Sequence, residues 1–198
     1  MIDVEAIPYT VTHSSSFMDF KGRELISEKM LAYMDSCFAK YTDKQQTILS
    51  VGNISVSREV DELITEKYPI QEADYIMCTL CHDRHWTLLV GVVKGKYWAF
   101  LNSLPKDHHK EILNDVVQKL HGDVGESFDT DIRIWLINYP SGVPTQINSI
   151  DCGMFVCKYM EELVKHEDVD WEQHKNFQDK MTLFRVELAY AILCSFAK

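Results

Sequence analysis

The stretch Gln-Ile-Asn-Ser-Ile-Asp-Cys-Gly at positions 146–153 constrains this chain more than any other. It closes a loop rich in proline and glycine and runs directly into a pattern in which apolar residues recur every four positions. Cys152 therefore stands at the predicted start of a helix. Unpaired N–H groups and the positive end of the helix dipole favour an anion there, so this position makes a cysteine a stronger nucleophile near neutral pH. The alternative is a small buried hydrophobic residue, which is how most cysteines outside disulfides are used.

The composition is that of an ordinary globular domain, with 46% hydrophobic and 25% charged residues in a chain of 198. No apolar run is long enough to span a bilayer, and residues 1–10 lack the basic and apolar segments of a secretory signal. Six cysteines are too few for a disulfide scaffold of this size and fit a reducing compartment. The net charge of −10 argues against nucleic acid as the main partner. We expect one domain with neither nucleic acid nor membrane as a partner, and an N-terminal arm at residues 1–20.

The order of the predicted elements indicates an α+β fold in one domain. Helical patterns cover residues 23–40, a segment that Ser55 or Ser57 could cap and that ends before Pro69, residues 105–120, the stretch that starts at Cys152, and residues 177–196. Strand patterns cover residues 74–81, 86–93, 96–101 and 131–138. We expect Gly122 and Gly125 to end the third helix. The last helix is apolar around much of its circumference, which predicts packing on more than one side.

The predicted hairpin at residues 86–101 supplies a base for the cysteine. A nucleophilic thiol needs a group that takes its proton and later protonates the leaving group, and histidine suits both steps. A two-residue turn at Lys94-Gly95 folds the second strand back on the first, which brings His85 and Asn102 to the same open end. Asn102 is then placed to hold the ring of His85. The alternatives are a surface histidine and a turn asparagine.

Negative charge that develops on an attacked carbonyl requires donors already aimed at it. The backbone N–H of Cys152 is one candidate, and the side-chain amide of Gln146 is another. The alternative for Gln146 is a solvated loop residue. The sequence thus presents His85, Asn102, Gln146 and Cys152 in this order, each at the edge of a predicted element.

A second group of residues has types that bind zinc, namely Cys78, Cys81, His82 and His85. All four lie within eight residues of sequence, and no second ligand pair follows at zinc-finger spacing. Cys78 and Cys81 also point to opposite faces of a strand. We therefore interpret them as packed strand cysteines, and we assign Cys157 to the core side of its helix.

Three segments resemble the family of SUMO-specific cysteine proteases, of the ULP/SENP type related to adenovirus proteinase. They are His-Trp-Thr-Leu-Leu at 85–89, Leu-Asn-Ser-Leu at 101–104 and the stretch 146–155, and the similarity covers residues 75–165 well. The resemblance implies a papain-like cysteine protease fold, with a central, mostly antiparallel sheet flanked by helices. It also implies a role for each matching residue: His85 as general base and acid, Asn102 as its orienting group, Cys152 as nucleophile, Gln146 in the oxyanion hole, and Trp86 as a wall of a narrow tunnel for a diglycine tail. Glycines suit such a tunnel because they carry no side chain.

One departure from the family concerns Asn102, because most relatives carry aspartate there. Aspartate stabilises an imidazolium by its charge, whereas asparagine only orients the ring. Papain-like enzymes also use a Cys-His-Asn arrangement. We therefore expect activity with a shifted pH profile.

The resemblance implies a single catalytic domain over residues 1–198 that cleaves after the C-terminal Gly-Gly of a ubiquitin-like modifier, SUMO first. Precursor maturation and release from lysine both fit, without a metal or organic cofactor. It implies a monomer in the nucleus or cytoplasm whose partners are the modifier and its conjugates. The alternatives are a deneddylase or deubiquitinase of the same fold, an acyltransferase that passes a thioester to an amine, and a non-catalytic modifier-binding module. The joint presence of His85, Asn102, Gln146 and Cys152 argues against the last.

Overall fold

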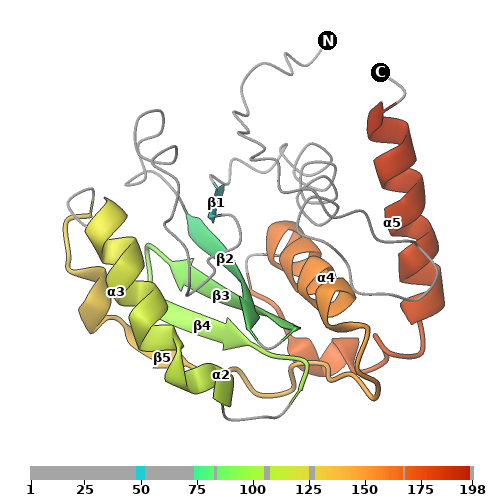
Figure 1. Cartoon of the computed structure of the whole chain (residues 1–198), viewed down its shortest axis with the longest axis horizontal. Helices are drawn as coiled ribbons and strands as arrows, with labels where there is room; N and C mark the ends of the chain where they lie inside the picture. The colour runs from blue at the N-terminus through green and yellow to red at the C-terminus, as the bar shows by residue number, and fades with distance from the viewer. Residues whose placement is uncertain are drawn as a thin grey trace.

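In the part of the chain that the computed structural model describes, five strands form one sheet with helices on both of its faces (Figure 1). The structure describes residues 48–51, 74–82, 84–104, 108–124, 128–166 and 168–196. The strands are β1 (Ile48–Val51), β2 (Tyr75–His82), β3 (His85–Val92), β4 (Tyr97–Leu101) and β5 (Leu136–Asn138). The helices are α2 (His108–Glu111), α3 (Leu113–Val124), α4 (Cys152–Lys165) and α5 (Met181–Phe196), with two 3-10 helices, η5 (Ile132–Ile134) and η6 (Trp171–His174). The arm and the two helices predicted before residue 70 lie outside the described residues.

The sheet has the order β1-β2-β3-β4-β5. The three long central strands pair antiparallel, with His82 opposite His85 and Leu88 opposite Leu101. The two short edge strands pair parallel, β1 with β2 and β5 with β4. The predicted strands at 74–81, 86–93 and 96–101 are thus confirmed within one or two residues, and so is the central, mostly antiparallel sheet.

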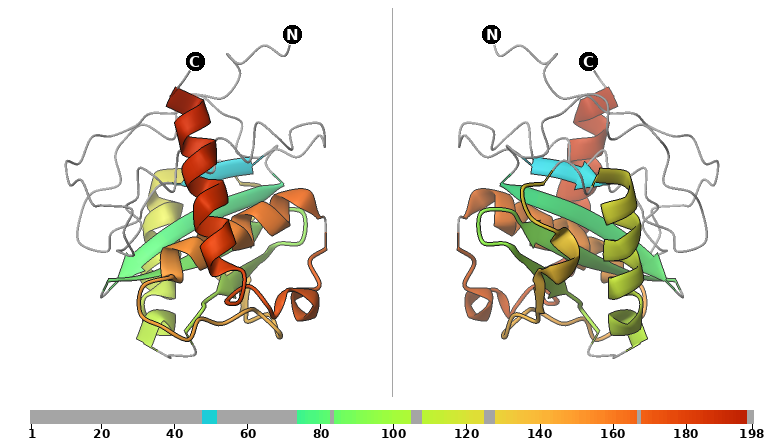
Figure 2. Two further views of the ribbon diagram at one scale, coloured as in Figure 1. Left: turned by 90° about the vertical axis from the view of Figure 1, so that its right-hand side faces the viewer. Right: turned by 90° about the vertical axis from the view of Figure 1, so that its left-hand side faces the viewer.

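Alternate residues of the central strands face two separate cores, because successive side chains of a strand point to opposite faces. Figure 2 shows α3 and α4 on opposite sides of the sheet. The core under α3 contains Ile76, Cys78, Leu80, Leu89, Trp98 and Phe100 from the strands. The core under α4 contains Tyr75, Met77, Trp86, Leu88, Val90 and Leu101 from the strands, together with Cys152 and Cys157 from α4. Cys78 and Cys81 pack on different cores, as predicted for strand cysteines.

The β3–β4 turn is longer than predicted. Val92 is opposite Tyr97, so four residues rather than two form the connection. Lys96 adopts the left-handed conformation, with φ 52°, and its N–H donates to Val93 O at 3.2 Å. A Cβ on Gly95 would lie 2.5 Å from the ring of Tyr97, so the glycine makes room for that ring. The open end of the hairpin is unaffected, because β3 and β4 keep a continuous antiparallel register.

The helical pattern at 105–120 becomes α2 and α3, but Gly122 does not end it. The helix α3 continues to Val124. A glycine inside a helix costs only about 1 kcal/mol relative to alanine. The buried Leu113, Val116 and Leu120 offset this cost by anchoring α3 on the sheet.

The strand predicted at residues 131–138 forms only over its last three positions. The Asp131 side chain accepts a hydrogen bond from Arg133 N at 2.9 Å and caps η5. Aspartate competes in this way with a strand ladder, because its carboxylate bonds its own nearby backbone.

The last helix begins at Met181 rather than at residue 177. Met181, Phe184 and Leu188 form its buried ridge. Leu183, Val186 and Tyr190 on the other side are exposed. Packing on more than one side is therefore wrong for residues 181–190, where α5 meets the core along a single ridge. Across the part of the chain that the structure describes, no helix combines the length and apolar character needed to cross a membrane.

Candidate active site

The open end of the β3–β4 hairpin joins His85 to Asn102. The Nε2 atom of His85 lies 2.8 Å from Asn102 Oδ1, and the same Oδ1 accepts the backbone N–H of Leu104 at 2.9 Å. A backbone N–H only donates, so the amide atom that it faces must be oxygen. His85 Nε2 faces this oxygen too and must therefore carry a hydrogen. In the neutral ring Nδ1 is then the basic nitrogen, which leaves it as the atom that accepts a proton.

Cys152 is the first residue of α4, as predicted, and is 1% exposed. Phe155 N donates to Asp151 O at 3.0 Å, which closes the first helical turn. Asp151 occupies the N-cap position, but its side chain makes no cap hydrogen bond. This carboxylate therefore accepts no hydrogen bond from the first N–H groups of α4. Those groups keep the partial positive charge that favours a thiolate or an oxyanion.

Two features bring the start of α4 to the hairpin. The helix packs on β3, and Cys152 shares one buried cluster with Trp86 and Leu88. The loop before α4 is fastened to the end of β4, because Gln146 N donates to Ser103 O at 2.9 Å. Ser103 directly follows Asn102. The loop that leads to Cys152 therefore lies close to the start of β3 and the end of β4.

Gln146 is buried rather than solvated, with 6% exposure. Its Nε2 donates to Asn148 O at 2.5 Å, and its Oε1 accepts the hydroxyl of Ser103, also at 2.5 Å. A side-chain amide nitrogen carries two hydrogens, and the bond to Asn148 uses one of them. The two contacts fix the rotamer of an amide that remains capable of a further donation. Sequence reasoning did not find Ser103, although it adjoins Asn102.

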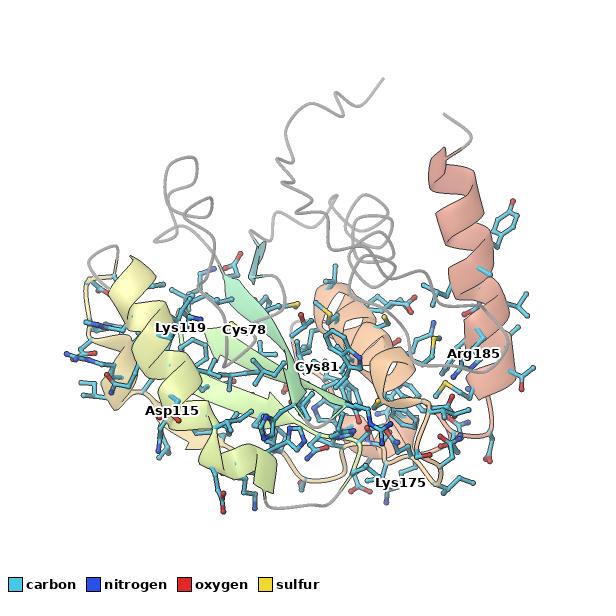
Figure 3. The ribbon with its side chains drawn as sticks, viewed as in Figure 1. Cys78, Cys81, Asp115, Lys119, Lys175 and Arg185 are labelled. Carbon is cyan, nitrogen blue, oxygen red and sulfur yellow. The ribbon has the colours of Figure 1, made fainter. Side chains whose placement is uncertain are left out.

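Asp151, the residue before Cys152, is the centre of a buried hydrogen-bond network. Its carboxylate accepts Asn148 Nδ2 at 2.6 Å, Gln178 Nε2 at 3.0 Å and a short bond from Arg185 Nη2. Burial raises the pKa of Asp151, but these hydrogen bonds and the Arg185 charge outweigh burial and hold the pKa below its ordinary value. Arg185 lies on the side of α5 that faces α4 (Figure 3). Sequence reasoning missed Gln178 and Arg185, because no fixed spacing marks partners about thirty residues away.

Two further histidines lie near His85: His109 contacts its ring, and His82 is its partner on the neighbouring strand. His109, on α2, is 1% exposed, and its ring lies 4.9 Å from that of His85 at 82°. The rings of His82 and His109 are 5.7 Å apart. Within the described ranges, no three His, Cys, Asp or Glu side chains are arranged to hold a metal ion. The rings of His85 and His109 meet edge to face, and Trp86, the next residue, is buried in the core under α4.

Comparisons with known proteins point to one family. Residues 16–194 match the family described as "Ulp1 protease family, C-terminal catalytic domain". The chain is 31% identical to sentrin-specific protease 2 of Rattus norvegicus over 127 residues, which is 62% of this chain and 20% of that protein. It is 27% identical to ubiquitin-like-specific protease 1A of Arabidopsis thaliana over 128 residues, which is 64% of this chain and 24% of that protein. The matched part of the chain thus spans only a fifth to a quarter of these relatives, 20% and 24%.

Solved structures share the fold. The C-terminal Ulp1 protease domain in complex with Smt3, the yeast orthologue of SUMO, has a TM-score of 0.62 at 21% identity, covering 90% of this chain and 80% of that one. The Xanthomonas campestris effector protein XopD bound to ubiquitin has a TM-score of 0.60 at 14% identity, covering 94% and 97%. At these identities the likeness concerns the fold, and it confirms the predicted α+β, papain-like cysteine protease architecture.

Proposed function

Since the chain belongs to the Ulp1 protease family, we propose that it is a cysteine peptidase that cleaves after the C-terminal Gly-Gly of a ubiquitin-like modifier, SUMO first. The observation that carries this proposal is the contact between His85 and Asn102 at 2.8 Å, beside the loop that leads to Cys152. SUMO is favoured because the matched relatives are named sentrin-specific and ubiquitin-like-specific proteases, and one structural neighbour is in complex with Smt3.

The first half-reaction forms a thioester. Nδ1 of His85 takes the proton of the Cys152 thiol, and the sulfur attacks the carbonyl carbon of the terminal glycine. The carbonyl electrons move to oxygen and then return as the C–N bond breaks. The imidazolium gives its proton to the leaving amine, which is a lysine side chain in a conjugate or a peptide N-terminus in a precursor. Asn102 keeps the ring in the required tautomer throughout, because its Oδ1 accepts Nε2–H.

The oxyanion of the tetrahedral intermediate needs fixed donors. We assign this role to the backbone N–H of Cys152 and to the second amide hydrogen of Gln146. Ser103 and Asn148 hold this amide in place, so little reorganisation is needed when the charge develops. We assign Trp86, next to His85, to the wall of the channel that admits the diglycine tail.

The second half-reaction releases the modifier. Nδ1 of His85 takes a proton from water, the hydroxide oxygen attacks the thioester carbon, and the C–S bond breaks. His85 returns this proton to the Cys152 sulfur, and the modifier leaves as a carboxylic acid that gives its own proton to water. This cycle requires neither a metal nor an organic cofactor. We place it in a monomer of the nucleus or cytoplasm, whose partners are the modifier and its conjugates.

Ubiquitin is the second candidate substrate, because a structural neighbour that covers 94% of this chain is bound to ubiquitin. The same chemistry serves either modifier, since both end in two glycines. The choice between them lies in the contacts of the modifier body, away from Cys152.

The test compares the wild-type chain with Cys152→Ala on a SUMO precursor that carries residues beyond Gly-Gly. We expect cleavage after the second glycine by the wild type, none by Cys152→Ala, and similar binding of SUMO by both. Cys157→Ala is the matched control, because it removes a second buried thiol from the same helix. Undiminished cleavage by Cys152→Ala, or its loss in Cys157→Ala alone, would refute the assignment.

A further inference from the structure

The N-cap residue of α4 is used in an unusual way. Aspartate at this position ordinarily accepts N–H groups of the first helical turn through its own carboxylate. Asp151 makes no such bond, although it is the N-cap and is buried. Its carboxylate points to donors from two other segments instead. A capping carboxylate would accept the same N–H groups that stabilise an ionised Cys152 or an oxyanion.

Two of the three donors that hold Asp151 come from the C-terminal part of the chain. Gln178 contacts the loop twice, because its Nε2 donates to Asp151 Oδ2 at 3.0 Å and its Oε1 accepts Ile147 N at 2.9 Å. Arg185 forms an ion pair with Asp151 Oδ1 and also reaches Ile150 O at 3.4 Å. The side chains of Arg185 and Asp151 are 25% and 6% exposed, so solvent screens this pair only partly. Asn148 completes the set from within the loop, at 2.6 Å from Oδ2.

We propose that Gln178 and Arg185 are positioning residues for the nucleophile, which hold the Asp151 carboxylate away from the first turn of α4 and fix the loop between Gln146 and Cys152. A carboxylate that capped α4 would place a negative charge beside the sulfur and consume the N–H groups that stabilise a thiolate. Arg185 neutralises this charge and also holds the carboxylate away from the first turn of α4. Gln178 spans the loop from Ile147 to Asp151 and sets the path of the chain into Cys152.

This inference rests on the proposed role of Cys152, so its test includes a measurement that needs no modifier. The rate of alkylation of Cys152 by iodoacetamide at pH 7 is followed by mass spectrometry. Cys78 does not interfere, because burial raises the pKa of its thiol to about 12. In parallel, kcat and KM are measured on SUMO with a fluorogenic C-terminal amide. The melting temperature of each variant is recorded.

Four variants distinguish an effect on the position of Cys152 from a general loss of protein stability. For Arg185→Met we expect alkylation and kcat to fall about tenfold, with KM within about twofold of the wild type. Gln178→Leu, which removes the amide of a half-buried side chain, is expected to act in the same direction and serves if Arg185→Met does not fold. In the double variant Asp151→Asn with Arg185→Met, no charge remains to cap α4, so alkylation recovers above that of Arg185→Met. Arg133→Ala is the control, since it breaks another arginine–aspartate pair, at 2.7 Å and more exposed to solvent. We expect it to leave both rates unchanged.

Wild-type rates in both Arg185→Met and Gln178→Leu overturn the inference. So does an equal loss in Arg133→Ala, or a double variant as slow as Arg185→Met with a correspondingly lower melting temperature. A wild-type chain that cleaves no modifier refutes the proposed function alone, and the alkylation rates then still decide whether Gln178 and Arg185 position Cys152.

Discussion

Asn102 Oδ1 accepts hydrogen bonds from two groups at once, the Nε2–H of His85 at 2.8 Å and the backbone N–H of Leu104 at 2.9 Å. The second bond fixes the orientation of the amide, and the first fixes the tautomer of the imidazole. Nδ1 of His85 is thereby the nitrogen available for proton transfer. The neutral amide performs this orientation without the charge that an aspartate would add.

The substitution Asn102→Asp tests the difference between orientation and charge. A carboxylate accepts the same two N–H groups and also stabilises a protonated His85. We expect activity to be kept and the alkaline limb of the pH–rate profile to move to higher pH, because the imidazolium then loses its proton later. Superimposable profiles of the two proteins would show that the charge has no influence on the ring.

Asn102→Ala removes the orientation itself. We expect kcat to fall about 10- to 100-fold, because the ring of His85 loses its partner while Cys152 and the oxyanion donors remain. The loss should be smaller than that of Cys152→Ala, measured as kcat on SUMO with a fluorogenic amide. A loss as complete as that of Cys152→Ala would give Asn102 a larger role than orientation.

Ser103→Ala tests the support of Gln146. The serine hydroxyl lies 2.5 Å from Gln146 Oε1 in a buried position, so its removal leaves that oxygen without this donor. We expect a loss of about 1–3 kcal/mol in the free energy of unfolding. A several-fold fall in kcat should accompany it, since the amide is less well fixed. Chemical denaturation and kinetics measure the two effects, with the exposed Ser141→Ala as control; a fall in stability without any change in kcat would argue that Gln146 is not an oxyanion donor.

Asp151 predicts a pH dependence of stability with a definite sign. Its pKa is below the ordinary 3.8 in the folded chain, because hydrogen bonds from Asn148, Gln178 and Arg185 outweigh burial. The ionised carboxylate therefore favours the folded state above that value, and this contribution is lost as the pH falls through the folded pKa.

The comparison of wild type with Asp151→Asn isolates this contribution. The difference in free energy of unfolding should be largest near neutral pH and shrink as the pH falls below about 4. Asp131, whose pKa the hydrogen bonds of Arg133 lower to about 2, titrates in both proteins and cancels from the difference. A difference that stays constant down to about pH 2 would contradict the assignment.

The sequence predicted those parts of the site that depend on local patterns. The alternating run on each side of Gly95 defined a hairpin, and a hairpin brings His85 to Asn102 even though its turn is two residues longer than expected. The four-residue apolar repeat after Cys152 defined α4 and its first residue. In each case hydrophobic periodicity decides the outcome, because the core selects the face that is buried.

Other parts depended on contacts between distant segments and were not predictable in this way. Gln178 and Arg185 reach Asp151 only because α5 packs next to α4, and Ser103 meets Gln146 across 43 residues. The apolar composition of α5 does not indicate which side of the helix packs on the core. Val186, for example, is apolar and yet 62% exposed. At Asp131 a local side-chain bond replaced the strand that alternation predicted.

The most direct test of the central claim is a map of the covalent adduct formed with modifiers whose C-terminal glycine carries an electrophile. SUMO, ubiquitin and a NEDD-type modifier are each incubated with the wild type and with Cys152→Ala, and the attached residue is identified by peptide mass spectrometry. We predict one adduct on Cys152, formed fastest with SUMO, and none on Cys152→Ala. An adduct on another cysteine, or equal labelling of Cys152→Ala, would contradict the account.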